Sequence, residues 1–176
     1  MKNLNLLVST SRFNETNAKS ELWFTLLICG DKYPIISNLE FSGLIAALTS
    51  IEKKQVMENI KKILRDDPHF FQYILKIIPI DYVCETNVNI IKQIIEKNYR
   101  NYIKKDESFR IKLKRRKNEV IDRKSFINFI AEVIDNPVDL ENPEKIVRIE
   151  VLGNSCGIAF LNSSDILKFK CRTSVA

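Results

Sequence analysis

The stretch RIKLKRRKN, residues 110–118, alternates basic and apolar side chains and then ends in consecutive cations. Six of its nine residues are Lys or Arg, and Phe109 stands directly before it. Period-two alternation is typical of a β-strand with one buried face. We therefore predict a strand from Phe109 to Lys114. Its core side chains are Phe109, Ile111 and Leu113, and its outward row, spaced about 6 to 7 Å apart, consists of Arg110, Lys112 and Lys114.

The net charge of the chain is concentrated around this strand. Residues 104–124 contain ten Lys or Arg and four Asp or Glu, whereas the rest of the chain contains 18 of each sign. One interpretation is a solvated edge strand whose cations prevent aggregation. The adjacent Arg115 and Arg116 suit bidentate phosphate contacts, and Arg123-Lys124 begin a predicted helix, whose N-terminus attracts phosphate. We therefore favour a site for a polyanion.

The first half of the chain predicts alternating strands and helices. We predict strands at 5–10, 35–36, 43–48 and 73–78, and helices at 17–28 and 51–64. Asn17 and Ser50 are the expected helix caps. This β-α-β-β-α-β order is the ferredoxin-like plan, which we assign to residues 1–80.

The second half also mixes helices with strands. We predict a connector at 79–84, a helix at 86–102, the basic strand, and a helix at 123–134 capped by Asp122. An extended segment at 138–140, a turn at 142–143 and a hairpin of strands 146–152 and 156–161 follow. The predicted fold class is α+β, with domains at 1–80 and 81–176.

Several classes of catalytic site are absent from the sequence. With four glycines, the chain contains neither GxGxxG nor GxxxxGK[ST], the loops through which a backbone approaches a nucleotide. His69 is the single histidine, and the four cysteines form no CxxC pair, so we expect neither a metal nor a catalytic triad. No segment has the ~18 apolar residues of a membrane helix, and no processing signal is visible. We expect a cytoplasmic protein with scattered, reduced thiols and no membrane contact.

The pattern of cations favours RNA over duplex DNA. The sequence has no basic stripe on a recognition helix, no paired aromatic residues on a basic strand as in an RRM, and no GxxG loop as in a KH domain. Cations on a strand contact phosphates, which position a ligand but carry little sequence information. A structured RNA that is recognised by its shape and its end fits best.

Three segments of the second half resemble a THUMP domain: SFRIKLKRRKN (108–118), VDLENP (138–143) and the strand VRIEV (147–151). The resemblance covers about residues 80–165. It implies an RNA-binding module of the kind found in tRNA-modifying proteins, where THUMP domains typically engage the acceptor end of tRNA. A ferredoxin-like domain commonly precedes THUMP, which agrees with the plan of the first half.

Two further segments narrow the resemblance to one group of THUMP proteins. VSTSRFNETNAKSEL (8–22) and IPIDYVCET (78–86) are similar to stand-alone THUMP proteins that assist tRNA cytidine acetylation. That family implies a protein without catalytic domain, cofactor or small-molecule substrate, which binds tRNA and presents it to an RNA cytidine acetyltransferase that makes N4-acetylcytidine. The sparse glycines are the main departure from the family.

The predicted RNA-binding residues are Arg110, Lys112, Lys114, Arg115, Arg116, Lys117, Asn118, Arg123, Lys124 and Asn142. For Asn142, in the Asp-Leu-Glu-Asn-Pro segment, a turn-forming role and an RNA contact remain equal alternatives. Three other functions stay open: a tRNA-binding subunit or fragment of a THUMP-containing methyltransferase or sulfurtransferase, an RNA-binding protein without a modification partner, and an enzyme of unknown type.

Overall fold

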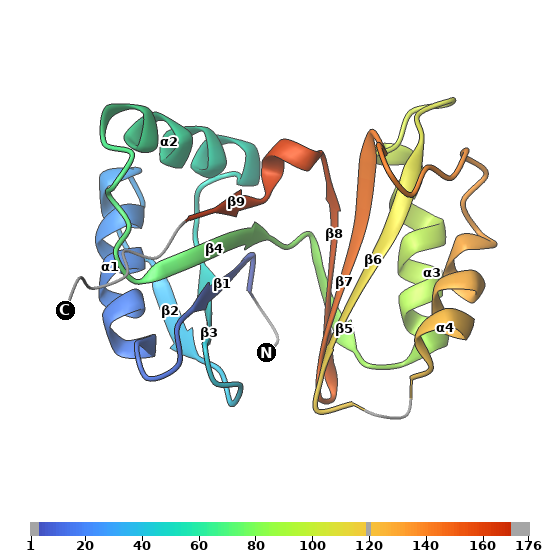
Figure 1. The fold of residues 1–176 in the computed structure, drawn as a ribbon, viewed down its shortest axis with the longest axis horizontal. Helices are drawn as coiled ribbons and strands as arrows, with labels where there is room; N and C mark the ends of the chain where they lie inside the picture. Colours follow the sequence, from blue (N-terminus) through green and yellow to red (C-terminus); the bar gives the residue numbers. More distant parts are fainter. Residues whose placement is uncertain (1–3, 119–120, 170–176) are drawn as a thin grey trace. The chain divides into compact units, whose positions relative to one another are not determined.

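The computed structural model describes residues 4–118 and 121–169, so Cys171 lies outside the described residues. The chain divides into two compact units (Figure 1). The N-terminal unit contains residues 4–79 and 165–169, and the C-terminal unit contains residues 80–164. Within the described ranges, no helix is long and apolar enough to cross a membrane.

The N-terminal unit is an antiparallel sheet with two helices (Figure 1). Its elements are β1 (Leu6–Thr10), α1 (Glu15–Ile28), β2 (Ile35–Asn38), β3 (Leu44–Leu48), α2 (Lys53–Asp66) and β4 (Ile74–Pro79). The strand order β2-β3-β1-β4 places β2 at one edge of the sheet. The predicted β-α-β-β-α-β order of elements is confirmed.

Both predicted helix caps in this unit are wrong. Helix α1 begins at Glu15, ahead of Asn17, so the Asn17 side chain lies inside the first turn. Helix α2 begins at Lys53, and Ser50 is occupied elsewhere. The hydroxyl and the backbone N–H of Ser50 both donate to the Asp31 carboxylate, at 3.0 and 3.1 Å, which ties two loops together instead of closing a helix.

A strand from the far end of the chain completes the first sheet. β9 (Leu167–Lys168) pairs with β4, with Leu167 opposite Ile77. Leu167 and Phe169 pack against the core of the N-terminal unit, and the ring of Phe169 lies 4.5 Å from that of Phe71. The sequence assigned residues 81–176 to one domain, whereas the structure ends the C-terminal unit at Ser164.

The C-terminal unit is a mixed sheet covered by two helices (Figure 1). Its elements are β5 (Tyr82–Glu85), α3 (Val88–Asn98), the 3₁₀-helix η1 (Tyr99–Asn101), β6 (Phe109–Arg116), α4 (Arg123–Ala131), β7 (Lys145–Leu152) and β8 (Ser155–Leu161), and the 3₁₀-helix η2 (Ser163–Asp165) leads on to β9. The strand order is β5-β8-β7-β6, and only the β6–β7 pair is parallel among the described strands of this sheet. Residues 79–84 are therefore not a mere connector, because most of β5 lies there.

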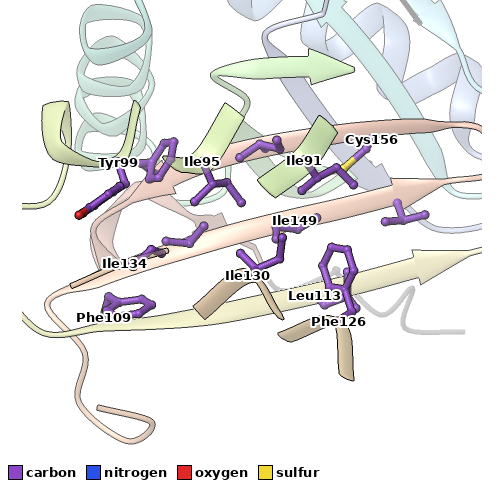
Figure 2. Packing of buried hydrophobic residues seen from close by; sticks show 14 of the residues in the cluster. Ile91, Ile95, Tyr99, Phe109, Leu113, Phe126, Ile130, Ile134, Ile149 and Cys156 are labelled. Carbon is purple, nitrogen blue, oxygen red and sulfur yellow. The ribbon is translucent and has the colours of Figure 1, made fainter. Parts of the chain in front are cut away.

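Helices α3 and α4 pack on one face of this sheet. Figure 2 shows side chains of both helices over those of β6 and β7. Phe109 and Leu113 of β6 are 1% exposed, and Ile111 is partly buried against the same core. The predicted alternation of β6 is confirmed, and the strand continues two residues further, to Arg116.

Candidate nucleic-acid interface

The outward residues of β6 form one row of cations. Side chains alternate along a strand, so Arg110, Lys112, Lys114 and Arg116 share the sheet face opposite helices α3 and α4. We call these four residues the β6 row. Lys114 and Arg116 are exposed, whereas Arg110 and Lys112 are half-buried. Because these four cations occupy alternate positions of one strand, they form a line of partners for a ligand with regularly spaced phosphates.

Strand β6 lies at the edge of its sheet, and two arginine side chains tie it to the start of α4. Arg123, the first residue of α4, donates a hydrogen bond from Nη1 to the Leu113 carbonyl at 3.1 Å. Arg115 Nη1 donates to the carbonyl of Ile121 just before the helix. Both guanidinium groups therefore position the start of α4 on β6, and each keeps further N–H donors for a ligand.

The first turn of α4 also carries a negative charge. The Asp122 carboxylate accepts a hydrogen bond from the backbone N–H of Ser125 at 2.8 Å, which confirms the predicted cap. The hydrogen bond from Ser125 lowers the pKa of Asp122, and the nearby Arg115 adds to that effect. Lys124 is exposed beside this cap. Because Asp122 occupies an N–H group of the helix end, phosphate binding here depends on the side chains of Arg123 and Lys124.

The turn after β6 depends on Asn118. Its Oδ1 accepts the N–H of Ile121 at 3.2 Å, and its Nδ2 lies 3.5 Å from the carbonyl oxygen of Gly153. Lys117 has a positive φ of 49°, which suits a tight turn. Asn118 therefore shapes the loop that presents Arg116 and Lys117, in addition to its predicted contact with RNA.

A groove opens between the start of β6, α4 and the segment at 138–140. Its volume is about 390 Å³. Its lining residues are Phe109, Arg110, Ile111, Lys112, Arg123, Ile127, Ala131, Val138 and Leu140. Every charged residue in that lining is a cation. The groove thus combines apolar walls with positive charge, a combination that suits a nucleotide base and its phosphate.

Arg110 links the β6 row to this groove. Its Nη1 donates to the Leu140 carbonyl at 2.9 Å. Its Nε is buried and has no hydrogen-bond partner in the described part of the chain. A buried charged donor without an acceptor costs free energy, and a phosphate oxygen or a water molecule removes that cost.

Asn142 lies in the turn that follows the segment at 138–140, outside the elements that hold the other predicted residues. The Asp139 carboxylate accepts the backbone N–H groups of Glu141 and Asn142, each at 2.9 Å, and so forms a turn. The backbone of Asn142 serves that turn, and its side chain is exposed. The other predicted residues lie on β6, in the turn after it and in the first turn of α4.

An ion pair that was not predicted from the sequence lies beside the β6 row. Arg148 Nε donates to Glu150 Oε1 at 2.6 Å, and the two residues are 3% and 6% exposed. In the β6–β7 register, Lys112 lies opposite Arg148 and Lys114 opposite Glu150. The alternation in VRIEV (147–151) could have predicted this ion pair, because it places Arg148 and Glu150 on one face of β7.

Two of the cysteines are neighbours in space. Cys84 of β5 lies directly opposite Cys156 of β8 in the antiparallel register. A hydrogen bond with the Cys156 thiol lowers the pKa of Cys84, and the same bond raises the pKa of Cys156. The expectation of scattered thiols is wrong for this pair. The described residues contain no cluster of three or more His, Cys, Asp or Glu arranged to hold a metal ion.

The comparison with protein families identifies the C-terminal unit. A model described as the THUMP domain matches residues 85–161, from the end of β5 to the end of β8. These residues form a THUMP domain. The match includes β6, α4 and the groove, so the candidate interface lies on the THUMP domain.

A curated relative also contains this domain. The chain is 29% identical over 98 residues to the THUMP domain-containing protein 1 homolog of Drosophila melanogaster. The similar region is 52% of this chain and 30% of the fly protein. The chain therefore matches about a third of that relative.

Solved structures share the fold of nearly the whole chain. PH1313 from Pyrococcus horikoshii Ot3 is 18% identical with a TM-score of 0.71, and the match covers 94% of this chain and 55% of that one. TrmN from Thermus thermophilus has 12% identity and a TM-score of 0.57, with coverages of 88% and 44%. A 4-thiouridine synthetase in complex with RNA and ATP has 12% identity and a TM-score of 0.57, with coverages of 95% and 42%. At these identities the likeness concerns the fold alone.

Proposed function

We propose that this protein is a tRNA-binding adaptor without catalytic activity of its own. It binds tRNA near the acceptor end and presents it to an RNA cytidine acetyltransferase, which forms N4-acetylcytidine. The N-terminal unit is the ferredoxin-like domain that precedes THUMP in this arrangement, and the complex acts in the cytoplasm. A THUMP domain suggests tRNA binding, and this chain carries one at residues 85–161.

The observation that carries the proposal is the unpartnered Nε of Arg110 at the join between the β6 row and the groove. Phosphates of a tRNA strand lie along the β6 row, and one phosphate oxygen accepts from this Nε once the Arg110 side chain turns outward. The apolar walls of the groove, with Val138 and Leu140 59% and 70% exposed, give an unpaired base a surface to pack on. Base packing explains why the end of the tRNA, where nucleotides are unpaired, is the part engaged.

The acetyltransferase partner is supported by the resemblance of residues 8–22 and 78–86 to stand-alone THUMP proteins. The similarity to the THUMP domain-containing protein 1 homolog supports the THUMP part of that resemblance. The chain also lacks the glycine loops through which a backbone approaches a nucleotide cofactor.

A second candidate is a tRNA-binding part of a larger modification enzyme. The chain covers less than half of both TrmN and the 4-thiouridine synthetase, although most of the chain matches each of them. On this alternative, a methyltransferase or sulfurtransferase domain would act in the same polypeptide or complex. Formation of 4-thiouridine or of a methylated base, rather than N4-acetylcytidine, would distinguish it.

The test combines binding with modification. The parent protein and a Lys114→Glu, Lys124→Glu variant are titrated with bulk tRNA, with and without the 3′ CCA end. Both lysines are exposed, so the variant alters charge without touching the core. A Lys62→Glu variant, on the exposed side of α2, is the matched control. Each protein is then added to an RNA cytidine acetyltransferase from the same organism, and N4-acetylcytidine is measured in the tRNA.

The proposal expects intact tRNA to bind best to the parent and to the Lys62 variant, with acetylation stimulated by both. The double variant loses at least about tenfold in affinity, because two phosphate contacts become repulsive. Equal binding of tRNA and random DNA by all three proteins would show that the β6 row is a solvated edge without a specific ligand. Specific tRNA binding without any effect on acetylation would support the tRNA interface and would contradict the acetyltransferase as the partner.

A further inference from the structure

Two thiols of the C-terminal unit face each other across a pair of antiparallel strands. Cys84 of β5 lies directly opposite Cys156 of β8 in the strand register. Residues opposite each other in such a pair point to the same face of the sheet, and their Cα atoms are about 4.5–5.5 Å apart. A disulfide joins residues whose Cα atoms are about 4.4–6.8 Å apart. The two backbones therefore already lie within the reach of a disulfide.

Closing that bond requires a small movement, which β5 is able to make. Both cysteines are free thiols in this structure. A disulfide needs Cβ atoms about 3.5–4.5 Å apart, whereas those of a cross-strand pair are about 4.5–5.5 Å apart. Strand β5 has four residues and lies at the edge of its sheet, where it pairs with β8 alone among the described strands. Because a short edge strand shifts more easily than a central one, a local adjustment brings the two sulfurs together.

The two thiols differ in their access to solvent. Cys156 is fully buried, in the core cluster that also contains Ile91 and Ile149 (Figure 2). Cys84 is half-buried and lines a hollow of about 650 Å³ beside the end of β5. A small oxidant is therefore able to reach the sulfur of Cys84, whereas the sulfur of Cys156 is shielded by the core.

The hydrogen bond between the thiols also makes them differ in acidity. It lowers the pKa of Cys84, and this effect outweighs burial and the neighbouring Glu85 carboxylate, which both raise that pKa. The same bond raises the pKa of Cys156, and burial adds to the rise. The thiolate is the form of cysteine that reacts with oxidants. Cys84 is thus suited to react first, and Cys156 is suited to attack the oxidised Cys84.

We propose that Cys84 and Cys156 form a reversible disulfide in response to peroxide, and that this bond fastens the edge strand β5 to β8. The Cys84 thiolate attacks one oxygen of hydrogen peroxide, so the O–O bond breaks, an S–O bond forms and hydroxide leaves. The Cys156 sulfur then attacks the Cys84 sulfur, so an S–S bond forms and the S–O bond breaks. The two thiol protons end in water: two thiols lose two electrons, and one peroxide becomes two water molecules.

The proposed bond encloses most of the THUMP domain in one covalent loop. The chain between the two cysteines contains α3, β6, α4 and β7. A cross-link that closes a long loop restricts the unfolded chain more than one that closes a short loop. In the strand order β5-β8-β7-β6, the bond lies on the far side of the sheet from the β6 row. Oxidation is therefore expected to stabilise the domain without occupying the residues proposed to bind RNA.

The surroundings of the pair favour this chemistry over two other roles. Thiols that only fill a core are shielded from solvent, whereas Cys84 lines the hollow. A structural metal ion is held by about four ligands, and the described residues contain no suitable group of even three His, Cys, Asp or Glu. Two adjacent thiols, one accessible and one buried, match the arrangement of a reactive cysteine and its resolving partner.

The experiment oxidises the full chain with hydrogen peroxide and maps its disulfides. The parent, a Cys84→Ser variant and a Cys156→Ala variant are oxidised in the folded state, alkylated and digested without reduction, and cross-linked peptides are identified by mass spectrometry. Cys29→Ser is the matched control. Cys29 is half-buried like Cys84 but lies in the N-terminal unit, and burial raises its pKa to about 11. Thermal unfolding and amide hydrogen exchange are measured before oxidation, after it, and after reduction by dithiothreitol.

We expect the parent and the Cys29 variant to form a cross-link between Cys84 and Cys156 that dithiothreitol removes. On oxidation their thermal midpoints rise by about 5–10 °C, and amide exchange in β5 slows at least about tenfold. The Cys84 and Cys156 variants show neither change. A parent in which Cys84 stays reduced, is oxidised without joining Cys156, or joins another cysteine overturns the inference. A cross-link that leaves amide exchange in β5 unchanged also overturns it, because the strand would not be fastened.

Discussion

The two sheets of this protein expose edge strands of opposite chemistry. Strand β6 carries a cation at every second position, and the charge excess of the chain surrounds it. Strand β2, with the sequence IISN, carries no charge, and its Ile35 is exposed. Both edges have backbone groups without a neighbouring strand, and natural proteins protect such edges with charge or by covering them.

The difference teaches that only one of these two edges is built as a line of charge. The lysines and arginines of β6 protect it against other strands and at the same time form a line of phosphate-binding groups. β2 is short and uncharged, so its edge offers phosphates no such line. The following predictions test that difference.

The largest expected effect is on the inner side of β6. Phe109→Ala removes a 1% exposed ring from the core beneath the β6 row and is expected to lower the free energy of unfolding by about 3–5 kcal/mol. Lys114→Ala, on the outer side of the same strand, is expected to change it by less than about 0.5 kcal/mol. Urea unfolding of the two variants beside the parent measures both values. Equal effects would mean that the two sides of β6 do not divide into core and surface.

The second effect is the salt dependence of tRNA binding. If the β6 row and its neighbours contact four to six phosphates, log affinity falls with log salt with a slope of about −3 to −5. Each single cation-to-alanine change, such as Lys114→Ala, lowers the magnitude of the slope by about one. Titrations at several salt concentrations measure the slope. Substitution of Lys19, exposed on α1 of the N-terminal unit, leaves the slope unchanged if tRNA contacts the β6 row and its neighbours alone.

A smaller effect concerns the attachment of α4 to the β6 edge. Arg123→Ala removes the hydrogen bond to the Leu113 carbonyl and is expected to cost about 1 kcal/mol of unfolding free energy, which is the usual net contribution of one such bond. Arg123→Lys keeps the charge but not the planar fork, so tRNA affinity should recover more than stability does. Thermal unfolding and tRNA titration of both variants separate the two roles. A fully stable Arg123→Ala protein would show that the helix docks without this bond.

The smallest effect is the pH dependence of the α4 cap. The folded-state pKa of Asp122 lies below its usual value of about 3.9, chiefly because Ser125 donates to it. The cap therefore contributes its full stabilisation above the unfolded pKa and loses it as the pH falls through the lower, folded pKa. Asp122→Asn retains a capping side chain but cannot titrate, so its acid unfolding curve should be flatter than the parent's over that range. Identical curves would show that Asp122 does not couple to folding.

Much of the local structure follows from neighbouring residues. The alternation around RIKLKRRKN predicted β6, and Asp122 predicted the start of α4, because both signals involve residues within a few positions of one another. The cap at Ser50 failed for the opposite reason. Ser50 is held by Asp31, which is 19 positions away, and no local pattern contains that contact.

The candidate interface divides in the same way. The sequence by itself determined which residues carry the charge of β6 and that three of them share a face, since charge and alternation are properties of the chain. Only the tertiary structure decided that Arg110 reaches the Leu140 carbonyl and that Cys84 lies opposite Cys156. It also decided that β9 returns to the first sheet beside β4. These pairings join residues tens of positions apart, and they form only because burying two cores brings distant strands into register.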